Sequence, residues 1–110
     1  MHLPGADRAV VEPTKVRDYL LSREHPVGRF KARVFASAGY GAAQWEVLQR
    51  DLQVVALSED ATLVRAEPYG QLFEIRAILQ GLTGPLPVLT VWIVRQTEDF
   101  PRFVTAYPRP

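Results

Sequence analysis

The stretch that decides the fold is residues 25–40, HPVGRFKARVFASAGY, which carries the start and stop signals of one helix. Pro26 suits a first helical turn, where its missing N–H costs nothing, and Gly39 suits the left-handed residue that ends a helix. Mainly apolar residues between them share one face at three- and four-residue spacing: Val27, Phe30, Lys31, Val34, Phe35 and Ala38. We expect a helix over 26–38 whose buried stripe includes Lys31.

The start of this helix gathers side chains that can carry positive charge. His25 and Arg29 lie at its N-terminus, and Lys31 follows on the expected inner face. A helix N-terminus also presents unpaired backbone N–H donors and the positive end of the helix dipole, so it attracts anions. Together these features predict a phosphate-binding site.

Each of these residues also has an ordinary structural interpretation. Lys31 could snorkel, with its stem on apolar surface and its amine in water. His25 could be a helix cap or a solvated loop residue, and Arg29 and Arg33 could belong to a solvated helix face. For any one of them alone the structural interpretation is the stronger; their combination strengthens the interpretation as a site, and both interpretations stay open.

Length and composition limit the function classes. A chain of 110 residues predicts a single domain spanning 1–110. The absence of cysteine excludes disulfides, thiolate metal sites and a cysteine nucleophile. The net charge of +1 is not that of a strongly basic DNA-binding protein, so a nucleic-acid role needs a local basic site. With only two histidines, we expect no metal and no cofactor.

The chain shows no targeting signal. The first eight residues lack an apolar segment of the kind found in secretory signals, and no apolar run is long enough to cross a membrane. We expect a cytoplasmic protein without a membrane partner.

Outward from the central helix, the pattern changes from helical to extended after Ser58. Residues 9–12 are a candidate edge strand or ordered arm. Helices are expected over 13–21, 26–38 and 42–57, and strands over 62–66, 71–79, 88–94 and 103–107. Short turns between consecutive strands imply antiparallel neighbours. The predicted fold is α+β, with about three N-terminal helices packed on one face of a four-stranded antiparallel meander sheet.

Strand alternation suggests where binding side chains would lie. Thr90 and Trp92 share one face of their strand, and Thr105 and Tyr107 share one face of the next. If these faces coincide, hydroxyl groups could hold a phosphate while aromatic rings stack a base. The alternative is that these residue types are there for strand packing alone. No phosphate-binding glycine loop, dinucleotide fingerprint or nucleophile elbow is present, so any chemistry is expected to be acid–base work by His25, Lys31, a tyrosine or an arginine.

Two blocks of the sequence resemble a known family. They are residues 19–40, containing Tyr19-Leu20-Leu21 and a His-Pro-x-Gly-x-x-Lys-Ala motif from His25 to Ala32, and residues 69–108, containing Tyr69-Gly70, Val91-Trp92-Ile93 and 101–108. Together they resemble a bacterial family of small domains of unknown function, which occur alone and as C-terminal tips of polymorphic toxins. Those tips are similar to the barnase–EndoU–colicin–RelE class of metal-independent RNases.

The resemblance implies a metal-independent, toxin-like RNA endonuclease that works by acid–base attack of the ribose 2′-OH. The residues to which the resemblance implies roles are His25, Arg29 and Lys31 from the helix and Thr90, Thr105 and Tyr107 from the strands. We expect the catalytic residues to be His25, Arg29, Lys31 and Thr105, and the substrate-binding residues to be Thr90, Trp92, Arg102 and Tyr107. The implied partners are RNA and a small antitoxin or immunity-type protein. Two alternatives stay open: a non-catalytic protein-binding module of the same fold, and a small-molecule pocket under the helix.

Overall fold

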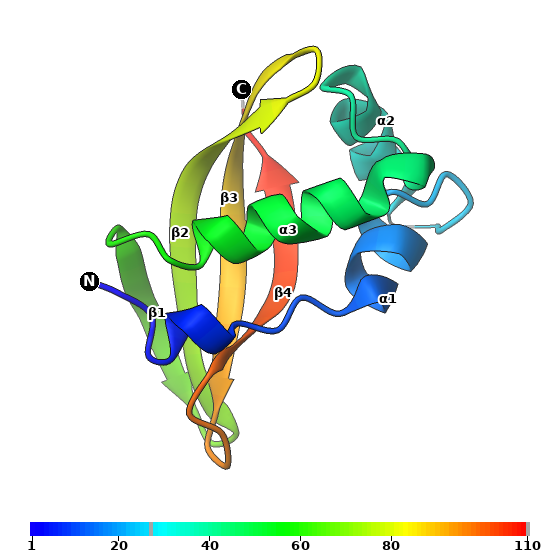
Figure 1. Cartoon of the computed structure of the whole chain (residues 1–110). Helices are drawn as coiled ribbons and strands as arrows, with labels where there is room; N and C mark the ends of the chain where they lie inside the picture. Colours follow the sequence, from blue (N-terminus) through cyan, green and yellow to red (C-terminus); the bar gives the residue numbers. More distant parts are fainter. Residues whose placement is uncertain (27, 110) are drawn as a thin grey trace.

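The four strands expected in the second half of the chain form one antiparallel sheet in the order β1-β2-β3-β4 (Figure 1). In the computed structural model, which describes residues 1–26 and 28–109, they are β1 Ala61–Glu67, β2 Gly70–Gly81, β3 Gly84–Arg95 and β4 Pro101–Pro108. Each strand pairs with the next one along the chain. The predicted meander is confirmed.

The helices precede the sheet, as predicted. They are α1 Pro13–Lys15, which continues into the π-helical turn η2 Val16–Leu20, then α2 Arg29–Ser37 and α3 Trp45–Val55, with short 3-10 turns η1 Ala6–Arg8 and η3 Ala42–Gln44. In Figure 1, α3 crosses the face of the sheet, whereas α1 and α2 lie toward the β4 edge. Within the described residues, no helix is both long and apolar enough to cross a membrane.

The central helix ends as predicted but begins later. Pro26 lies in the turn before α2, which starts at Arg29, and Val27, expected in the buried stripe, lies outside the described residues. At the other end Gly39 has a φ of 96°, and the N–H of Tyr40 donates to the carbonyl of Phe35 at 2.9 Å. This is a left-handed helix end of the Schellman type, and the Phe35 and Tyr40 rings meet edge-on beneath it.

The expected buried stripe of α2 is wrong at two positions. Phe30 is 58% exposed and Val34 is 38% exposed. The helix instead turns Gly28 and Ala32 inward, because its start packs closely on η2: a Cβ on Gly28 would overlap the carbonyl oxygen of Tyr19. Small residues therefore set the contact face, and the apolar residues one step round the helix are left outside. Lys31 remains partly buried.

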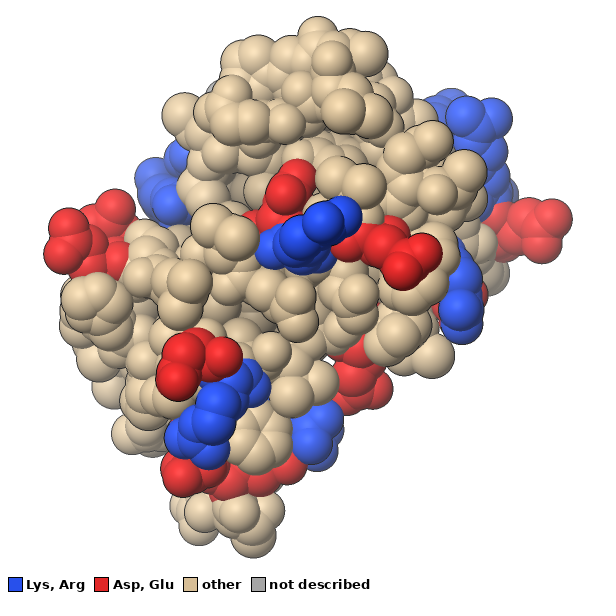
Figure 2. Space-filling view, viewed as in Figure 1, with Lys and Arg blue, Asp and Glu red and all other residues tan. Residues whose placement is uncertain are grey.

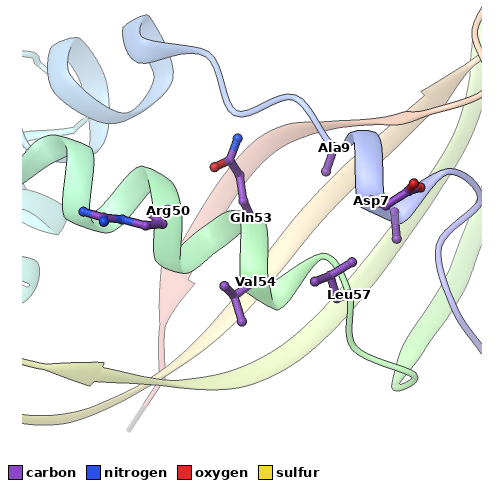
Figure 3. A pocket seen from close by; sticks show the side chains of 7 residues that line it. Asp7, Ala9, Arg50, Gln53, Val54 and Leu57 are labelled. Atoms are coloured by element: carbon purple, nitrogen blue, oxygen red, sulfur yellow. The ribbon is translucent and has the colours of Figure 1, made fainter.

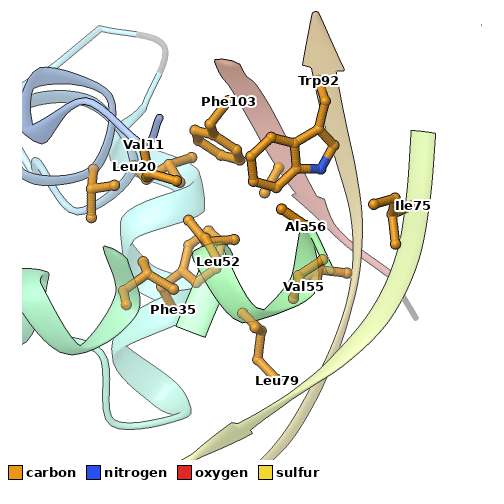
Figure 4. Packing of buried hydrophobic residues seen from close by; sticks show 14 of the residues in the cluster. Val11, Leu20, Phe35, Leu52, Val55, Ala56, Ile75, Leu79, Trp92 and Phe103 are labelled. Carbon is orange, nitrogen blue, oxygen red and sulfur yellow. The ribbon is translucent and has the colours of Figure 1, made fainter. Parts of the chain in front are cut away.

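The core fills the space between α3 and the inner face of the sheet (Figure 4). Phe73, Ile75 and Leu79 lie on one face of β2 and are buried in this core, because side chains two or four positions apart in a strand point the same way. Trp92 of β3 packs edge-on against Phe103 of β4, with ring centroids 5.4 Å apart.

A bulge in β4 overturns the expected alternation of the last strand. Trp92 pairs with Phe103, but Val91 pairs with Thr105, so Val104 is an extra residue in β4. Phe103 and Ala106 are therefore both buried, and Thr105 moves to the outer side of the sheet together with Tyr107. The predicted shared face of Thr90, Trp92, Thr105 and Tyr107 is wrong, because one inserted residue reverses the alternation beyond it.

An N-terminal arm covers the first half of the β4 edge. Val10 forms a parallel bridge beside Arg102, with backbone hydrogen bonds of 2.9 Å from Val10 N–H to the Pro101 carbonyl and from Phe103 N–H to the Val10 carbonyl. The arm then turns into α1. Helices flank the second half of β4, and the candidate site lies there.

Candidate functional site

A pocket of about 440 Å³ opens where α1, η2 and the loop before α2 meet the second half of β4. All but one of its lining residues carry a hydroxyl, phenol, imidazole or charged group, and the exception is Val104. The lining residues are Thr14, Lys15, Asp18, Tyr19, His25, Val104, Thr105 and Tyr107. The volume is that of an ordinary small-ligand site. Segments far apart in the sequence therefore contribute to one concave polar surface.

Lys31 lies beside this pocket and contacts three of the residues that line it, Tyr19, Thr105 and Tyr107. Its Nζ donates hydrogen bonds of 3.0 Å to Tyr19 OH and of 3.0 Å to Thr105 Oγ1. The same ammonium group lies 4.1 Å from the centroid of the Tyr107 ring and 5.1 Å from that of Tyr19, which are cation–π distances. Lys31 reaches Thr105 from beside the sheet because the β4 bulge turns Thr105 outward.

The Tyr19 phenol is electrostatically altered by its neighbours. Burial raises its pKa, but the hydrogen bond and charge of Lys31, the Thr105 hydroxyl and the charge of Lys15 together outweigh burial and lower the pKa below its usual value. A phenol made more acidic in this way loses its proton more readily. Tyr19 was not among the predicted site residues. Its presence in the block of family resemblance was the one sequence feature that pointed to it.

His25 occupies the rim between the pocket and α2. Its Nδ1 accepts a hydrogen bond of 3.0 Å from the Gly28 N–H, and its ring meets the Tyr19 ring edge-on at 4.9 Å. Because Nδ1 is an acceptor, the neutral ring carries its proton on Nε2. The hydrogen bond from Gly28 thus fixes the tautomer of the neutral His25 ring, and this bond and the Tyr19 ring together position it.

Asp18 is the acidic residue of the lining. Its carboxylate accepts from Arg17 Nε at 2.8 Å, and this hydrogen bond holds the pKa of Asp18 below its usual range. Asp18 therefore stays ionised, but its charge is offset by Arg17. Lys15 lines the pocket and the Lys31 ammonium lies beside it, so both give the rest of the pocket a positive character.

The structure brings together four of the predicted site residues: His25, Lys31, Thr105 and Tyr107. Arg29 is not among them. It lies on the other side of α2, with its guanidinium 4.9 Å from the Phe30 ring centroid.

The three remaining predicted residues are engaged elsewhere. Thr90 and Trp92 are fully buried in the core, where Trp92 Nε1 donates to Thr90 Oγ1 at 2.8 Å and the Thr90 hydroxyl donates to the Ile75 carbonyl at 2.9 Å. Arg102 binds Glu98 at 2.8 Å and Glu12 at 3.1 Å, which ties the N-terminal arm to β4. None of the three lines the pocket.

A separate groove of about 350 Å³ lies between the N-terminal segment and α3. Figure 3 shows Val54 of α3 and Leu57, which follows the end of α3, on one side of the groove, with Asp7 and Ala9 opposite. None of the predicted site residues lines it.

The groups in and beside the pocket next to β4 suit an oxyanion. Tyr19 and Thr105 accept hydrogen bonds from Lys31, and these bonds polarise their hydroxyl groups. An ammonium and two polarised hydroxyl groups stabilise negative charge on an oxyanion. Over residues 1–26 and 28–109, no three His, Cys, Asp or Glu side chains cluster closely enough to hold a metal ion.

Comparison with known proteins gives one result. The family model described as Domain of unknown function (DUF6883) matches residues 2–110. No curated protein and no solved structure matches the chain.

Proposed function

The chain belongs to the DUF6883 family of domains of unknown function, and we propose that it is a metal-independent RNA endonuclease whose active site is the pocket beside β4. One observation carries the proposal. The ammonium of Lys31 is held between the hydroxyl groups of Tyr19 and Thr105 at 3.0 Å each, and both of these residues line the pocket together with His25. Cleavage of RNA without a metal needs a cationic, hydrogen-bonding cradle for the phosphate and groups that move protons, and this pocket offers both.

The phosphate would bind at Lys31. Its ammonium offsets the negative charge that builds on the phosphorus oxygens as a fifth bond forms. Thr105 donates its hydroxyl proton to the same oxygens, and the exposed Tyr107 ring gives a base a surface on which to stack. Because these groups are held in place before substrate arrives, little reorganisation is needed during the reaction.

Tyr19 would move the proton, and His25 would assist as a hydrogen-bond donor. In its anionic form, which its lowered pKa favours, the Tyr19 oxygen takes the proton of the ribose 2′-OH as the 2′-oxygen attacks the phosphorus. The bond to the 5′-oxygen breaks, and the leaving oxygen receives that proton back from the Tyr19 hydroxyl, while the His25 Nε2–H donates a hydrogen bond to a phosphate oxygen. The products are a 2′,3′-cyclic phosphate and a 5′-hydroxyl, with no water consumed and no metal required.

The test is cleavage of an end-labelled single-stranded RNA in buffer that contains EDTA. We expect cyclic-phosphate products, and no cleavage where the 2′-OH is replaced by hydrogen. Lys31→Met should reduce the cleavage rate on the order of 100-fold, the loss seen when one group that stabilises transition-state charge is removed. Arg76→Met, which removes a charge from the exposed side of β2, should cleave as the parent does. A parent protein that leaves RNA intact contradicts the proposal.

A toxin-like role makes a further expectation. Induced expression of the parent protein should arrest growth, and Lys31→Ala should relieve the arrest. The second candidate function is a non-catalytic module that binds an antitoxin or immunity-type protein. The observation that favours it is the exposure of Phe30 and Val34 on α2. A stable complex that survives substitution of both Lys31 and His25, in a protein without RNA cleavage, would support it.

A further inference from the structure

Three arginines converge on the side of α2 that faces away from the pocket. Arg23, Arg29 and Arg33 line a hollow of about 320 Å³ together with Ala36. All three are exposed, and Figure 2 shows basic side chains gathered at the edge of the molecule where α2 lies in Figure 1. We call Arg23, Arg29, Arg33 and the neighbouring Phe30 the arginine face.

The arginines of the arginine face differ from most other arginines of the chain in that they form no ion pair. Five others each form an ion pair with a carboxylate, namely Arg8, Arg17, Arg65, Arg95 and Arg102. Among the described residues, no carboxylate lies within ion-pair distance of the three on this face, although Glu24 lines the adjoining hollow together with Arg23. Arg50, Arg76 and Arg109 also form no ion pair with a described residue, but Arg50 and Arg76 do not share a hollow with a second arginine. Three cations brought together without a carboxylate attract a polyanion.

An exposed aromatic ring accompanies these cations. Phe30 is 58% exposed, and the Arg29 guanidinium lies 4.9 Å from its ring centroid. Proteins that bind single-stranded nucleic acids combine a cationic track for the phosphates with aromatic side chains on which bases stack. A duplex offers no unstacked base to such a ring, so the ring favours a single strand.

The arginine face adjoins the proposed active site through one short loop. His25, on the rim of the pocket, accepts the Arg29 backbone N–H on its carbonyl at 3.0 Å. The first turn of α2 thus carries the pocket on one side and the arginines on the other. A nucleic-acid strand that leaves the pocket past His25 reaches the arginine face next.

We propose that the arginine face binds the phosphates of single-stranded RNA next to the bond being cleaved, with Phe30 stacking one base. This inference rests on the proposed function and specifies its substrate: a single-stranded oligonucleotide several nucleotides long, not a dinucleotide or a duplex.

The binding test uses a fluorescent single-stranded RNA of about 12 nucleotides, in the site-size range of such proteins, with 2′-O-methyl groups that block cleavage. Arg29→Gln/Arg33→Gln should weaken binding at least tenfold, and the slope of log affinity against log salt should fall by about 1.4, or 0.7 for each phosphate that is no longer neutralised. Phe30→Ala should weaken binding about tenfold through loss of stacking. The control is Arg50→Gln/Arg76→Gln, which removes the same charge elsewhere. An equal loss of RNA affinity in the two double variants would overturn the inference. So would a parent protein that binds a duplex as tightly as the single strand.

Cleavage of two substrates separates this inference from the proposed function. If both hold, the parent cleaves the 12-nucleotide RNA more efficiently than an RNA dinucleotide, and Arg29→Gln/Arg33→Gln removes that advantage without changing dinucleotide cleavage. If the double variant cleaves both substrates as the parent does, the arginine face has no role and the nuclease proposal stands. If nothing is cleaved but the double variant loses RNA binding, the nuclease proposal fails and the arginine face stands as an RNA-binding surface.

Discussion

Lys31 on α2 and Thr105 on β4 lie 74 residues apart in the sequence, yet the lysine Nζ donates a hydrogen bond of 3.0 Å to the threonine Oγ1. The contact depends on two local features. The β4 bulge at Val104 turns Thr105 to the outer side of the sheet, and the packing of Gly28 on Tyr19 rotates α2 so that Lys31 faces β4. The site is therefore as much a product of these two backbone features as of the side chains themselves.

The first prediction is that Lys31→Met changes function without changing the fold. The variant loses two hydrogen bonds, each worth about 1 kcal/mol, but no longer keeps a partly buried ammonium away from water. We expect the free energy of unfolding to stay within about 1 kcal/mol of the parent value. Inorganic phosphate should raise the melting temperature of the parent and of Arg76→Met, but not that of Lys31→Met. A Lys31→Met protein that binds phosphate and cleaves RNA as well as the parent would remove Lys31 from the site.

The second prediction concerns the order in which the tyrosines ionise. The pKa of Tyr19 is lowered, since the Lys31 and Thr105 contacts and the charge of Lys15 outweigh burial, whereas burial and the hydrogen bond to Asp51 raise the pKa of Tyr40. An absorbance titration of tyrosinate should show Tyr19 ionising before Tyr40. Tyr19→Phe should remove the early step, and Lys31→Met should move it to higher pH. An early step that is unchanged in Lys31→Met would contradict the assigned cause.

The two shifts have opposite effects on stability. The lowered pKa of Tyr19 gives stability that is present above the ordinary pKa of a tyrosine and is lost as pH falls through the folded value. The raised pKa of Tyr40 gives stability that is present below the ordinary value and is lost as pH rises through the folded one. Denaturant titrations from neutral to alkaline pH should therefore show Tyr40→Phe losing less stability than the parent as pH rises.

The third prediction is that Gly28→Ala damages the site more than the fold. The new Cβ overlaps the Tyr19 carbonyl oxygen, so the start of α2 must move away from η2. We expect a stability loss of about 1–3 kcal/mol from overpacking, together with a Tyr19 pKa that returns toward its ordinary value as Lys31 moves away. Ser37→Ala, a substitution at the exposed end of α2, should leave the titration of Tyr19 unchanged. A Gly28→Ala protein with the Tyr19 pKa of the parent would show that this glycine does not position the lysine.

Much of the fold could be predicted from local pattern. The alternation of Phe73, Ile75 and Leu79 identified the inner face of β2, and Gly39 identified the end of α2. These signals are local because a strand repeats every two residues and a left-handed helix end demands glycine. The face of α2 could not be predicted from apolar spacing, since Gly28 and Ala32 form the contact by being small while Phe30 stays outside.

The site was predictable only in part. His25 and Lys31 stood out because they lie at the start of one helix, and the structure places both beside Thr105 and Tyr107. Thr90 and Trp92 were grouped with them on the assumption of unbroken alternation, which the extra residue Val104 violates. A bulge of this kind leaves no mark in the residue types of a single sequence. Tyr19 was missed as a site residue because its proximity to Lys31 arises only from tertiary packing.

The last prediction tests whether Thr90 is a core residue or a site residue. Its hydroxyl accepts the buried Trp92 Nε1–H at 2.8 Å, so Thr90→Val leaves a buried donor without its partner and should cost about 1–3 kcal/mol. Thr90→Ser keeps the hydroxyl and should preserve more of that stability. In urea, Thr90→Val should lower the midpoint without changing the slope of the transition.

Thr90→Val/Trp92→Phe supplies the decisive comparison, because it removes the orphaned N–H together with its partner. The loss of unfolding free energy in the double variant should be smaller than the sum of the losses in the two single variants, since the two residues share one hydrogen bond. RNA cleavage should be unchanged in Thr90→Val, because the side chain is fully buried and does not line the pocket. If Thr90→Val instead abolished cleavage while keeping the stability of the parent, Thr90 would belong to the site and the division between core and pocket drawn from the β4 bulge would be wrong.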